Sequence, residues 1–408
     1  MHLINEIYVK LIKNLTINKI KYIFLIFLLS PFLILIVIIK PVLLVRFGHF
    51  DIQRIGIISY VEHYLLQNMN KKKKSKTFDI WVIDNHDYNK QFYLLLKRKF
   101  LIISELSIFY KVLELISKYI KIYSKHIIVL YDSAAAAPLD ISSCQLSLTS
   151  QEIKRGESFL KRFNIPSKSK IICFTCRDDL FLKKKFPSKN FSYHNYRDNN
   201  INNYIPTIKA LIKKDFYVVR MGQIAKKKIN IKNKKFIDYP FHPLKNDFMD
   251  FFFAYKCYFW IGGTAGIDNV AATFRKPLLD LNMVPIGGLK FSLKKTILCL
   301  KIHKNHNNRK LSLTEIFASG AFNSSEEFRK KKIKLEELTS NQIKDIVFEM
   351  IKLMKNSWKI KNKNDLKLQK KFKKLFLSKI NQIDPKLRYK FNALYSLSFL
   401  RKNSWFLK

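Results

Sequence analysis

The sequence predicts an α/β fold of two domains, each built on a parallel sheet, preceded by an N-terminal hydrophobic segment. Between residues 41 and 285, short apolar runs typical of buried strands alternate with helical stretches, which is the pattern of βαβ units. The 408 residues are enough for two domains of ordinary size with a sizeable core. We therefore divide the chain into four parts, residues 1–40, 41–165, 166–330 and 331–408.

The hydrophobic segment Tyr22–Ile39 carries no charge and is bounded by Lys21 and Lys40. As a helix it would reach about 27 Å, close to the ~30 Å hydrocarbon thickness of a bilayer. Pro31 predicts a kink in its middle, and no small-residue cleavage site of a signal peptide follows it. We expect a membrane anchor, either a single span or, preferably, a re-entrant segment with both ends in the cytoplasm. A helix buried in the protein core is the alternative.

The N-terminal half shows the strand–helix alternation. Strands are expected at Pro41–Arg46, Phe78–Ile83, Phe100–Ser104 and His126–Asp132, and helices at Ile57–Leu66 and Leu106–Ile122. The loop after the first strand contains His49 and Asp51, two side chains that can accept a proton. The structural alternative is that His49 ends the strand and that Asp51 caps the next helix.

The C-terminal half continues the pattern. Strands are expected at Lys170–Asp178, Phe216–Arg220 and Lys235–Asp238, and helices at Ile201–Lys213, Asp247–Lys256, Ser312–Ser319 and Thr339–Met354. Residues 358–408 are rich in lysine, and Lys371–Ile380 has the spacing of a basic amphipathic helix. Such a helix could lie on an anionic membrane; a solvated tail is the alternative.

The most informative segment is Cys257–Pro285. It predicts a buried strand (Tyr258–Ile261), a turn of small residues (Gly262–Gly266), a helix (Ile267–Phe274) and a second strand (Leu278–Leu281). A turn between a parallel strand and a helix leaves backbone N–H groups at the positive end of the helix dipole, where a phosphate can bind. The segment lacks both GxGxxG and GxxxxGK[ST], which argues against dinucleotide oxidoreductases and P-loop nucleotide hydrolases. Any strand–turn–helix unit could look similar.

Two predicted strands end in arginine. Arg177 closes one of them and Arg220 closes the next. Since ligands of open parallel sheets bind beyond the carboxyl ends of the strands, we expect both arginines and the glycine turn to converge on a pyrophosphate. Each arginine alone could instead form a structural ion pair. His194 is a third candidate, as a phosphate ligand or a structural hydrogen-bonding residue.

Several segments resemble a bacterial family of glycosyltransferases of surface-polysaccharide synthesis. They are YHNYRDNNINNYIPTIKAL, YVVRMG, FIDYP and DFMDFFFAYKCYFWIGGTAG. The resemblance covers residues 41–355 and is most specific between Arg177 and Pro285. It implies the GT-B arrangement, in which two Rossmann-like domains face each other across a cleft and the C-terminal domain binds the donor nucleotide. The Arg-Asp, His and Gly-Thr placements are more distantly similar to fucosyltransferases that use a GDP-sugar. Unlike many GT-B enzymes, this sequence has no Glu after the glycine turn to hold a ribose.

The resemblance implies transfer of a sugar from a nucleotide-sugar to a hydroxyl of a lipid-linked or surface glycan (lipopolysaccharide, O-antigen or capsule), at the cytoplasmic face of the bacterial inner membrane. Asp51, or else His49, is then the expected catalytic base. The expected donor-binding residues are Arg177, His194, Arg220, Gly262, Gly263, Thr264 and Gly266. We expect no cofactor and no metal, since the chain has no Asp-x-Asp motif.

Two other classes of protein stay open. A non-catalytic nucleotide- or sugar-binding scaffold at the membrane would keep the glycine turn and the arginines. A nucleic-acid-binding protein would fit the formal net charge of +46, but the chain has no nucleic-acid-binding motif. The five cysteines form no paired framework, which indicates a reducing compartment; Cys173 and Cys176 lie on one predicted strand and are not expected to bind a metal.

Overall fold

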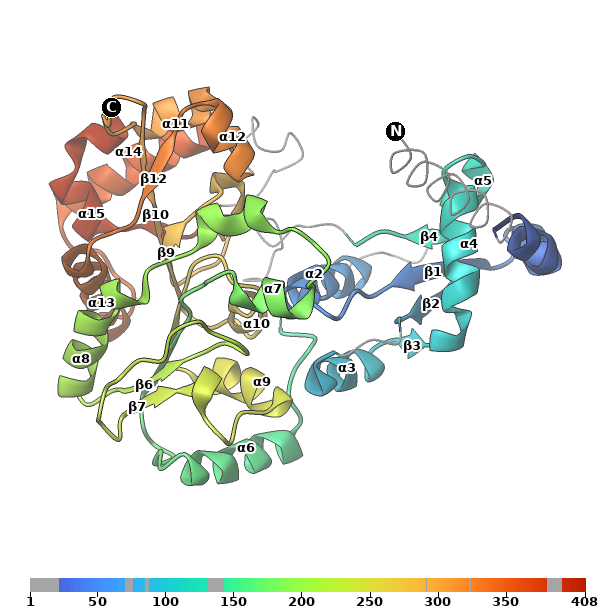
Figure 1. Ribbon diagram of the computed structural model, residues 1–408, viewed down its shortest axis with the longest axis horizontal. Helices are drawn as coiled ribbons and strands as arrows, with labels where there is room; N and C mark the ends of the chain where they lie inside the picture. Colours follow the sequence, from blue (N-terminus) through green and yellow to red (C-terminus); the bar gives the residue numbers. More distant parts are fainter. Residues whose placement is uncertain are drawn as a thin grey trace, which may run out of the picture. The chain divides into compact units, whose positions relative to one another are not determined.

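The computed structural model describes residues 22–69, 76–84, 88–130, 143–290, 292–322, 324–379 and 391–408. The chain forms two compact units (Figure 1), and each is an α/β unit on a parallel sheet, as predicted. Unit 1 comprises residues 1–54, 67–89 and 93–131, and unit 2 comprises residues 55–66, 90–92 and 132–408. The predicted boundaries differ from this division, because residues 132–165 and the predicted C-terminal region 331–408 belong to unit 2.

Unit 1 contains a four-stranded sheet in the order β3-β2-β1-β4. The strands are β1 (Leu44–His49), β2 (Thr77–Val82), β3 (Leu101–Ile102) and β4 (Ile127–Ile128), and every neighbouring pair is parallel. The long helix α4 (Ser107–Ser117) buries Val112 and Leu113 against Val45 and Phe47 of β1. The short helices α3 (Lys90–Lys97) and α5 (Lys121–Ser124) flank β3 and β4 in the sequence.

The predicted anchor forms one continuous helix over residues 22–38, which includes Pro31. Leu33 and Ile36, on one side of this helix, are buried in the core of unit 1. That side therefore fits the alternative that the helix packs in the protein core. Among the residues that the structure describes, no helix has both the length and the hydropathy needed to cross a bilayer.

Unit 2 is built on a seven-stranded sheet in the order β13-β10-β9-β8-β5-β6-β7. All its pairs are parallel. The strands are β5 (Ile171–Phe174), β6 (Tyr217–Arg220), β7 (Phe236–Asp238), β8 (Phe259–Gly262), β9 (Leu278–Met283), β10 (Thr296–Leu300) and β13 (Leu394–Tyr395). The direction of winding reverses between β5 and β8, so this pair marks the topological switch point at which open α/β sheets bind ligands.

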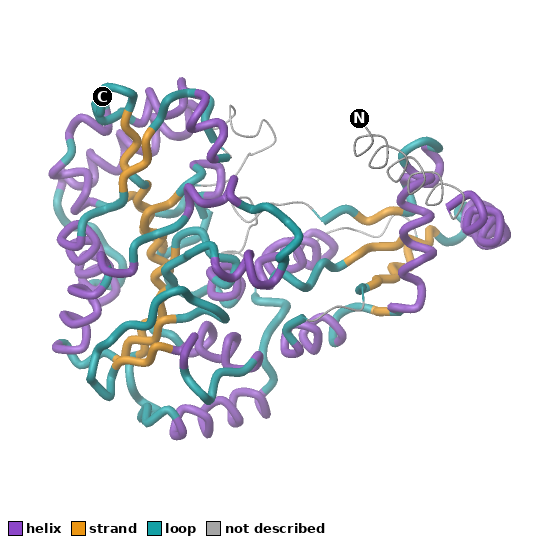
Figure 2. The backbone as a smooth tube through the Cα atoms, in the orientation of Figure 1, coloured by secondary structure: helices purple, strands orange, loops and turns teal. Residues whose placement is uncertain are grey.

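Helices cover both faces of this sheet (Figures 1 and 2). α8 (Ile205–Lys213) and α13 (Ser340–Lys355) contact each other and one face, and α9 (Asp247–Lys256) and α10 (Asp268–Thr273) contact the other. α13 begins with a capping box of Thr339 and Gln342, which confirms the predicted helix start. The remaining elements of this unit include α2 (Ile58–Met69), α6 (Ser150–Arg162), α7 (Leu180–Lys185), α11 (Leu313–Ser319), α12 (Ser325–Lys330) and the antiparallel pair β11 (Ile302–Lys304) and β12 (Lys334–Glu336).

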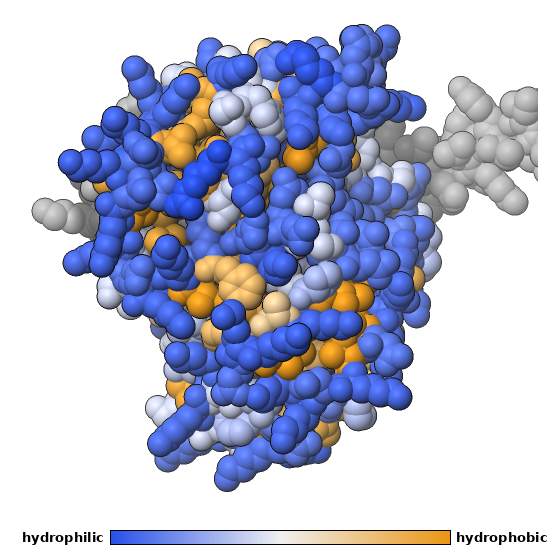
Figure 3. Space-filling view, turned by 90° about the vertical axis from the view of Figure 1, so that its left-hand side faces the viewer, coloured by the Kyte–Doolittle hydropathy of each residue, from blue (hydrophilic) through white to orange (hydrophobic). Residues whose placement is uncertain are grey.

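The lysine-rich C-terminal region is part of the core of unit 2. α14 (Lys363–Lys379) buries Phe372 and Phe376, which contact the rings of Phe391 and Tyr395. The apolar side of this basic helix is therefore covered by protein, and neither a solvated tail nor a membrane-bound helix describes it. The face of unit 2 seen in Figure 3 is covered mainly by hydrophilic side chains.

Candidate functional site

The glycine turn after β8 is closed by an internal carboxylate. Asp268, at the start of α10 and fully buried, accepts hydrogen bonds from the backbone N–H groups of Gly263 and Ala265, each at 3.0 Å. The same carboxylate accepts from Thr175 Oγ1 at 2.7 Å and from Trp260 Nε1 at 2.8 Å. Two backbone donors expected to bind a phosphate thus already bind an anion that belongs to the chain.

The glycines of this turn are required by close packing. A Cβ on Gly262 would lie 2.7 Å from Cγ of Asp268, and one on Gly263 would lie 2.7 Å from the carbonyl oxygen of Leu281. Gly266 is similarly crowded by the backbone of Gly56. These contacts explain the run of glycines without a ligand. The hydroxyl of Thr264 donates to the carbonyl oxygen of Arg197 at 3.2 Å, where we had expected a donor phosphate.

Arg220, the second arginine of the predicted anion site, is a structural residue. Its side chain is 2% exposed and donates to the carbonyl oxygen of Lys227 at 2.5 Å and to Asp238 Oδ1 at 3.4 Å. Burial raises the pKa of Asp238 above its usual value, although the N–H of Ile229 and the charge of Arg220 oppose this shift. Arg220 is thus paired within the protein, as the structural alternative supposes, and it lines neither of the two cavities described below.

Arg177, by contrast, lies at the carboxyl end of β5, directly at the switch point. It forms an ion pair with Asp198 and donates to the carbonyl oxygen of His194 at 3.2 Å. Its Nη2 is buried and has no hydrogen-bond partner among the described residues. The half-buried ring of His194 packs beside the ring of Tyr193, with centroids 4.1 Å apart. Arg177 therefore fixes the segment 194–198 over the switch point.

Lys301, which was not among the predicted site residues, also contacts the segment that Arg177 holds. Lys301 follows β10, is 5% exposed, and donates from Nζ to the carbonyl oxygen of Asp198 at 2.6 Å. Burial lowers the pKa of Lys301 below its usual value, although the nearby carboxylates of Glu337 and Asp198 oppose this shift. Lys301 and Arg177 thus approach Asp198 from the ends of two different strands. Both side chains lie at the edge of the sheet where a ligand is expected.

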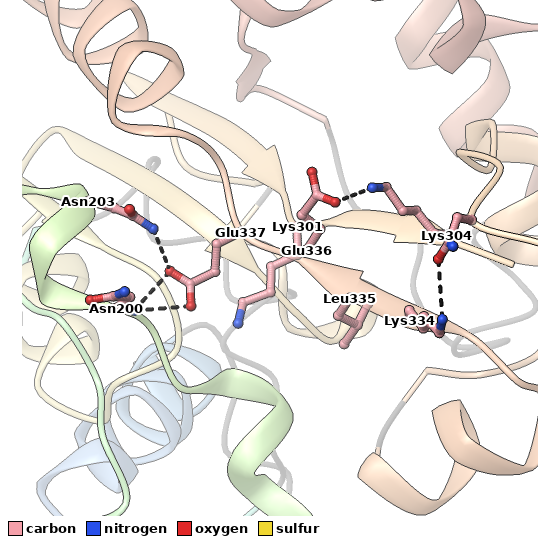
Figure 4. Close-up of a pocket in the computed structure, with 9 residues that line it drawn as sticks. Asn200, Asn203, Lys301, Lys304, Lys334, Leu335, Glu336 and Glu337 are labelled. Atoms are coloured by element: carbon pink, nitrogen blue, oxygen red, sulfur yellow. Dashed lines mark hydrogen bonds and ion pairs between the residues drawn. The ribbon is translucent and has the colours of Figure 1, made fainter. Parts of the chain in front are cut away.

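Lys301 also lines a cavity of about 530 Å³ (Figure 4). Glu337 on one wall accepts from the backbone N–H of Asn200 at 2.9 and 3.0 Å and from Asn203 Nδ2 at 3.2 Å. Lys304, paired with Glu336, and Lys334, which donates to Asn308 Oδ1 at 3.2 Å, form the other wall. The volume falls in the range of small-molecule sites, which is roughly 300–1,000 Å³.

A second cavity of about 580 Å³ shares Lys301, Lys334 and Leu335 with the first. Its lining adds the cations Arg329 and Lys332 and no carboxylate, together with the rings of Tyr196 and Phe328 and the side chain of Ile333. Cations beside aromatic and aliphatic surface are what a nucleotide diphosphate needs, because its phosphates require charge and its base requires a flat apolar contact.

The carboxyl edge of the sheet in unit 1 holds a histidine–carboxylate pair. His49 is the last residue of β1, and its Nε2 lies 3.3 Å from Oδ2 of Asp84, which follows β2. Asp84 also accepts from Ser107 Oγ at 2.7 Å and pairs with Lys111 Nζ at 2.8 Å. Burial would raise the pKa of Asp84, but the hydrogen bonds from Lys111 and Ser107 and the charge of His49 lower it to about 2. The ring of His49 stacks on Tyr110 at a centroid distance of 5.6 Å.

Asp51 differs from His49 in its surroundings. It is exposed, in a turn after β1, and its backbone carbonyl accepts from the N–H of Arg54 at 3.5 Å. α2 begins only at Ile58, so Asp51 does not cap that helix as the structural alternative supposed. A general base must lie close to the proton that it accepts. His49 has a carboxylate beside it, with Asp84 Oδ2 3.3 Å from its Nε2, although this nitrogen makes no hydrogen bond within the described part of the chain.

Sequence reasoning missed four of these residues, Asp84, Asp198, Asp268 and Lys301. Three of them lie in or next to a predicted feature: Asp84 comes after the strand expected to end at Ile83, Asp198 stands in the motif that contains His194, and Asp268 stands in the first turn of a helix. An acidic residue at that last position is a recognised helix-start signal. Lys301 carried no signal, because β10 was not among the predicted strands.

The chain matches no protein-family model and no curated protein sequence. Among solved structures it is similar to a glycosyl transferase family 9 protein from Veillonella parvula, at 9% identity and a TM-score of 0.38, over 64% of this chain and 86% of that one. It is also similar to the E. coli ADP-heptose lps heptosyltransferase II (12% identity, TM-score 0.36, 59% and 85% covered) and to MnaA of S. aureus with UDP (15%, 0.26, 58% and 78%). Similarity at this level assigns neither a family nor an activity, so the motif resemblance stays a prediction and the function rests on the residues of the site.

Proposed function

We propose that the protein is a glycosyltransferase that moves a sugar from a nucleotide-sugar donor to a hydroxyl of a cell-surface glycan. The observation that carries the proposal is a group of cations beside the carboxyl end of β10, where Lys301 after that strand and Arg329, Lys332 and Lys334 from the segment of α12 and β12 line two adjoining cavities. Such an edge is where open α/β sheets bind nucleotides, and the motifs that resemble surface-polysaccharide glycosyltransferases lie on the same unit.

In this proposal the donor diphosphate lies against Lys301 and Lys334, and not in the glycine turn, whose N–H groups serve Asp268. The cations stabilise the charge that develops on the leaving diphosphate, without a metal ion. Arg177 acts indirectly, because it pairs with Asp198, whose carbonyl oxygen accepts a hydrogen bond from Lys301. His49, whose Nε2 lies 3.3 Å from the carboxylate of Asp84, serves as the base toward the acceptor hydroxyl; Asp51 is the alternative base. The acceptor is a lipid-linked or surface glycan at the cytoplasmic face of the inner membrane.

The test is binding of donors to the full chain in mild detergent. A donor at about 100 times its Kd stabilises the fold by ~2.7 kcal/mol, or about 2–4 °C in Tm for domains of this size. We expect one of the UDP-, GDP-, CMP- or TDP-sugars to give this shift, and Lys301→Ala and Lys334→Ala to lose it. Lys352→Ala, on the exposed side of α13, is the matched control and should keep it.

Release of nucleotide from the bound donor, unchanged by a chelator, then measures turnover without a metal. If a donor binds and is never consumed with any glycan acceptor, the protein is a nucleotide-sugar-binding scaffold. If no donor binds, the cavity has been assigned to the wrong ligand.

A further inference from the structure

The helix formed by residues 22–38 presents a broad apolar face to solvent. Its exposed side chains include Ile23, Phe24, Phe27, Leu28, Leu35 and Ile38, each between 50% and 79% exposed. Their spacing of three and four residues places most of them along one side of the helix. Continuous apolar surfaces of this kind are rare on soluble proteins and mark a binding surface.

The opposite side of the helix is fixed to unit 1. Leu33 and Ile36 are 3% and 6% exposed and belong to the same core cluster as Phe47 of β1 and Val112 of α4. Leu25, Ile26 and Leu29 are partly buried against that cluster. Since protein covers one side along the length of the helix, lipid chains cannot surround it. The exposed side can still lie flat on an apolar layer.

Cations accompany the apolar face. Lys40 follows the helix directly, and Lys118, Lys121 and Lys125 are exposed in the segment from α4 to α5. Tyr123 of α5 packs on the core cluster that holds Leu33 and Ile36, so this segment and the helix share one core in unit 1. Burial lowers the pKa of His126, the residue after Lys125; the hydrogen bond with the carbonyl oxygen of Val45 opposes this shift and the charge of Lys40 adds to it.

The exposed lysine segment also carries apolar side chains. Tyr119 and Ile120 are 82% and 50% exposed between Lys118 and Lys121. Apolar side chains alternating with lysines match the boundary of a bilayer, where acyl chains accept the apolar groups and anionic headgroups attract the cations. A protein partner would need an apolar surface with an acidic rim, whereas an anionic membrane supplies both properties everywhere.

We propose that unit 1 binds the surface of a bilayer that contains anionic lipids, with the helix 22–38 lying in the plane of the interface. Its exposed apolar side chains enter the acyl boundary, and Lys40, Lys118, Lys121 and Lys125 contact the headgroups. If the acceptor is lipid-linked, which rests on the proposed function, this contact brings unit 1 to the layer that holds the acceptor. The membrane contact itself does not depend on the donor chemistry.

The experiment is co-flotation of the full chain with vesicles of phosphatidylcholine alone or with about 30% phosphatidylglycerol. Wild-type protein should bind the anionic vesicles more strongly, and salt should reduce that difference. The variant Phe24→Ser, Phe27→Ser and Leu35→Ser should weaken binding to both vesicles by about 100-fold or more. Replacing Lys118, Lys121 and Lys125 by Gln should weaken only the binding to anionic vesicles.

Phe241→Ser with Leu366→Ser, two exposed apolar positions of unit 2, is the matched control and should bind as wild type does. All variants should keep the donor-induced thermal shift, which separates a failure of this inference from a failure of the proposed function. Two results would overturn the inference. One is an equal affinity of wild type and the triple Ser variant for vesicles. The other is a wild-type protein that forms a dimer and does not bind vesicles, while the triple Ser variant is monomeric.

Discussion

Each of the two sheets has a carboxylate after the carboxyl end of one of its strands, and the two carboxylates have different partners. In unit 2, Asp268 follows β8 and its turn, and it accepts four hydrogen bonds, three of them from buried groups and one from the partly buried N–H of Ala265. In unit 1, Asp84 follows β2, keeps about a quarter of its side chain exposed, and faces the ring of His49. The partners of a carboxylate therefore decide whether it stabilises a turn or orients a reactive group.

Removal of the Asp268 carboxylate should have the largest effect on stability. Asp268→Ala leaves four donors, among them Thr175 Oγ1 and Trp260 Nε1, without their acceptor in a buried site. We expect the free energy of unfolding to fall by about 3–5 kcal/mol in urea titrations. Asp268→Asn keeps one acceptor oxygen and should lose less. Asp345→Ala, a partly exposed ion-pair residue, is the control. Little loss of stability together with a larger donor-dependent thermal shift than in wild type would show that the turn binds phosphate once its internal carboxylate is removed.

The pair in unit 1 is tested by turnover. Asp84→Asn should lower kcat by about 100-fold with little change in KM for the donor, because His49 loses the negative charge 3.3 Å from its ring. It should also shift the pH–rate profile, which a purely structural role would not do. His49→Gln should be at least as damaging, and Asp51→Asn should stay near wild type. The reverse order for His49 and Asp51 would identify Asp51 as the base.

The packing explanation of the glycine turn predicts a smaller effect. Gly263→Ala forces a Cβ toward the carbonyl oxygen of Leu281 and should cost about 2–3 kcal/mol. Gly288→Ala is the matched control, because its Cβ would meet other atoms only at 3.8 Å or more. Chemical denaturation measures both. If Gly263→Ala were as stable as Gly288→Ala but had lost donor binding, a close approach of the ligand would explain the glycine better than packing does.

The smallest expected effect is the dependence of stability on pH. The pKa of Asp84 falls from 3.8 to about 2 on folding. A lowered carboxyl pKa contributes stability that is complete above the unfolded value, near pH 4, and is lost as the pH falls through about 2. After allowance for solvent screening this amounts to about 1 kcal/mol. The difference in unfolding free energy between wild type and Asp84→Asn should thus shrink between about pH 6 and about pH 2; a constant difference would contradict the assignment.

Local patterns were enough to predict most of the secondary structure. The helix Asp247–Lys256 is observed with the predicted bounds, and the strand expected at Tyr258–Ile261 is observed as β8, shifted by one residue. Both follow from the periodicity of apolar side chains and from end signals within a few residues. The strand β10 was missed, and with it Lys301, although every residue of its sequence TILCL after Thr296 is apolar.

The site was predicted less well than the fold, for a physical reason. The sequence by itself placed Arg177, His49 and the glycine turn at strand ends, because strand ends are local features. Only the tertiary structure decided their partners: Asp268 fills the turn, Asp238 holds Arg220, Asp84 holds His49, and Lys301 reaches Asp198 across 103 residues of chain. Hydrogen-bond partners of buried polar groups are set by strand order and helix packing, and single-sequence periodicity does not encode that order.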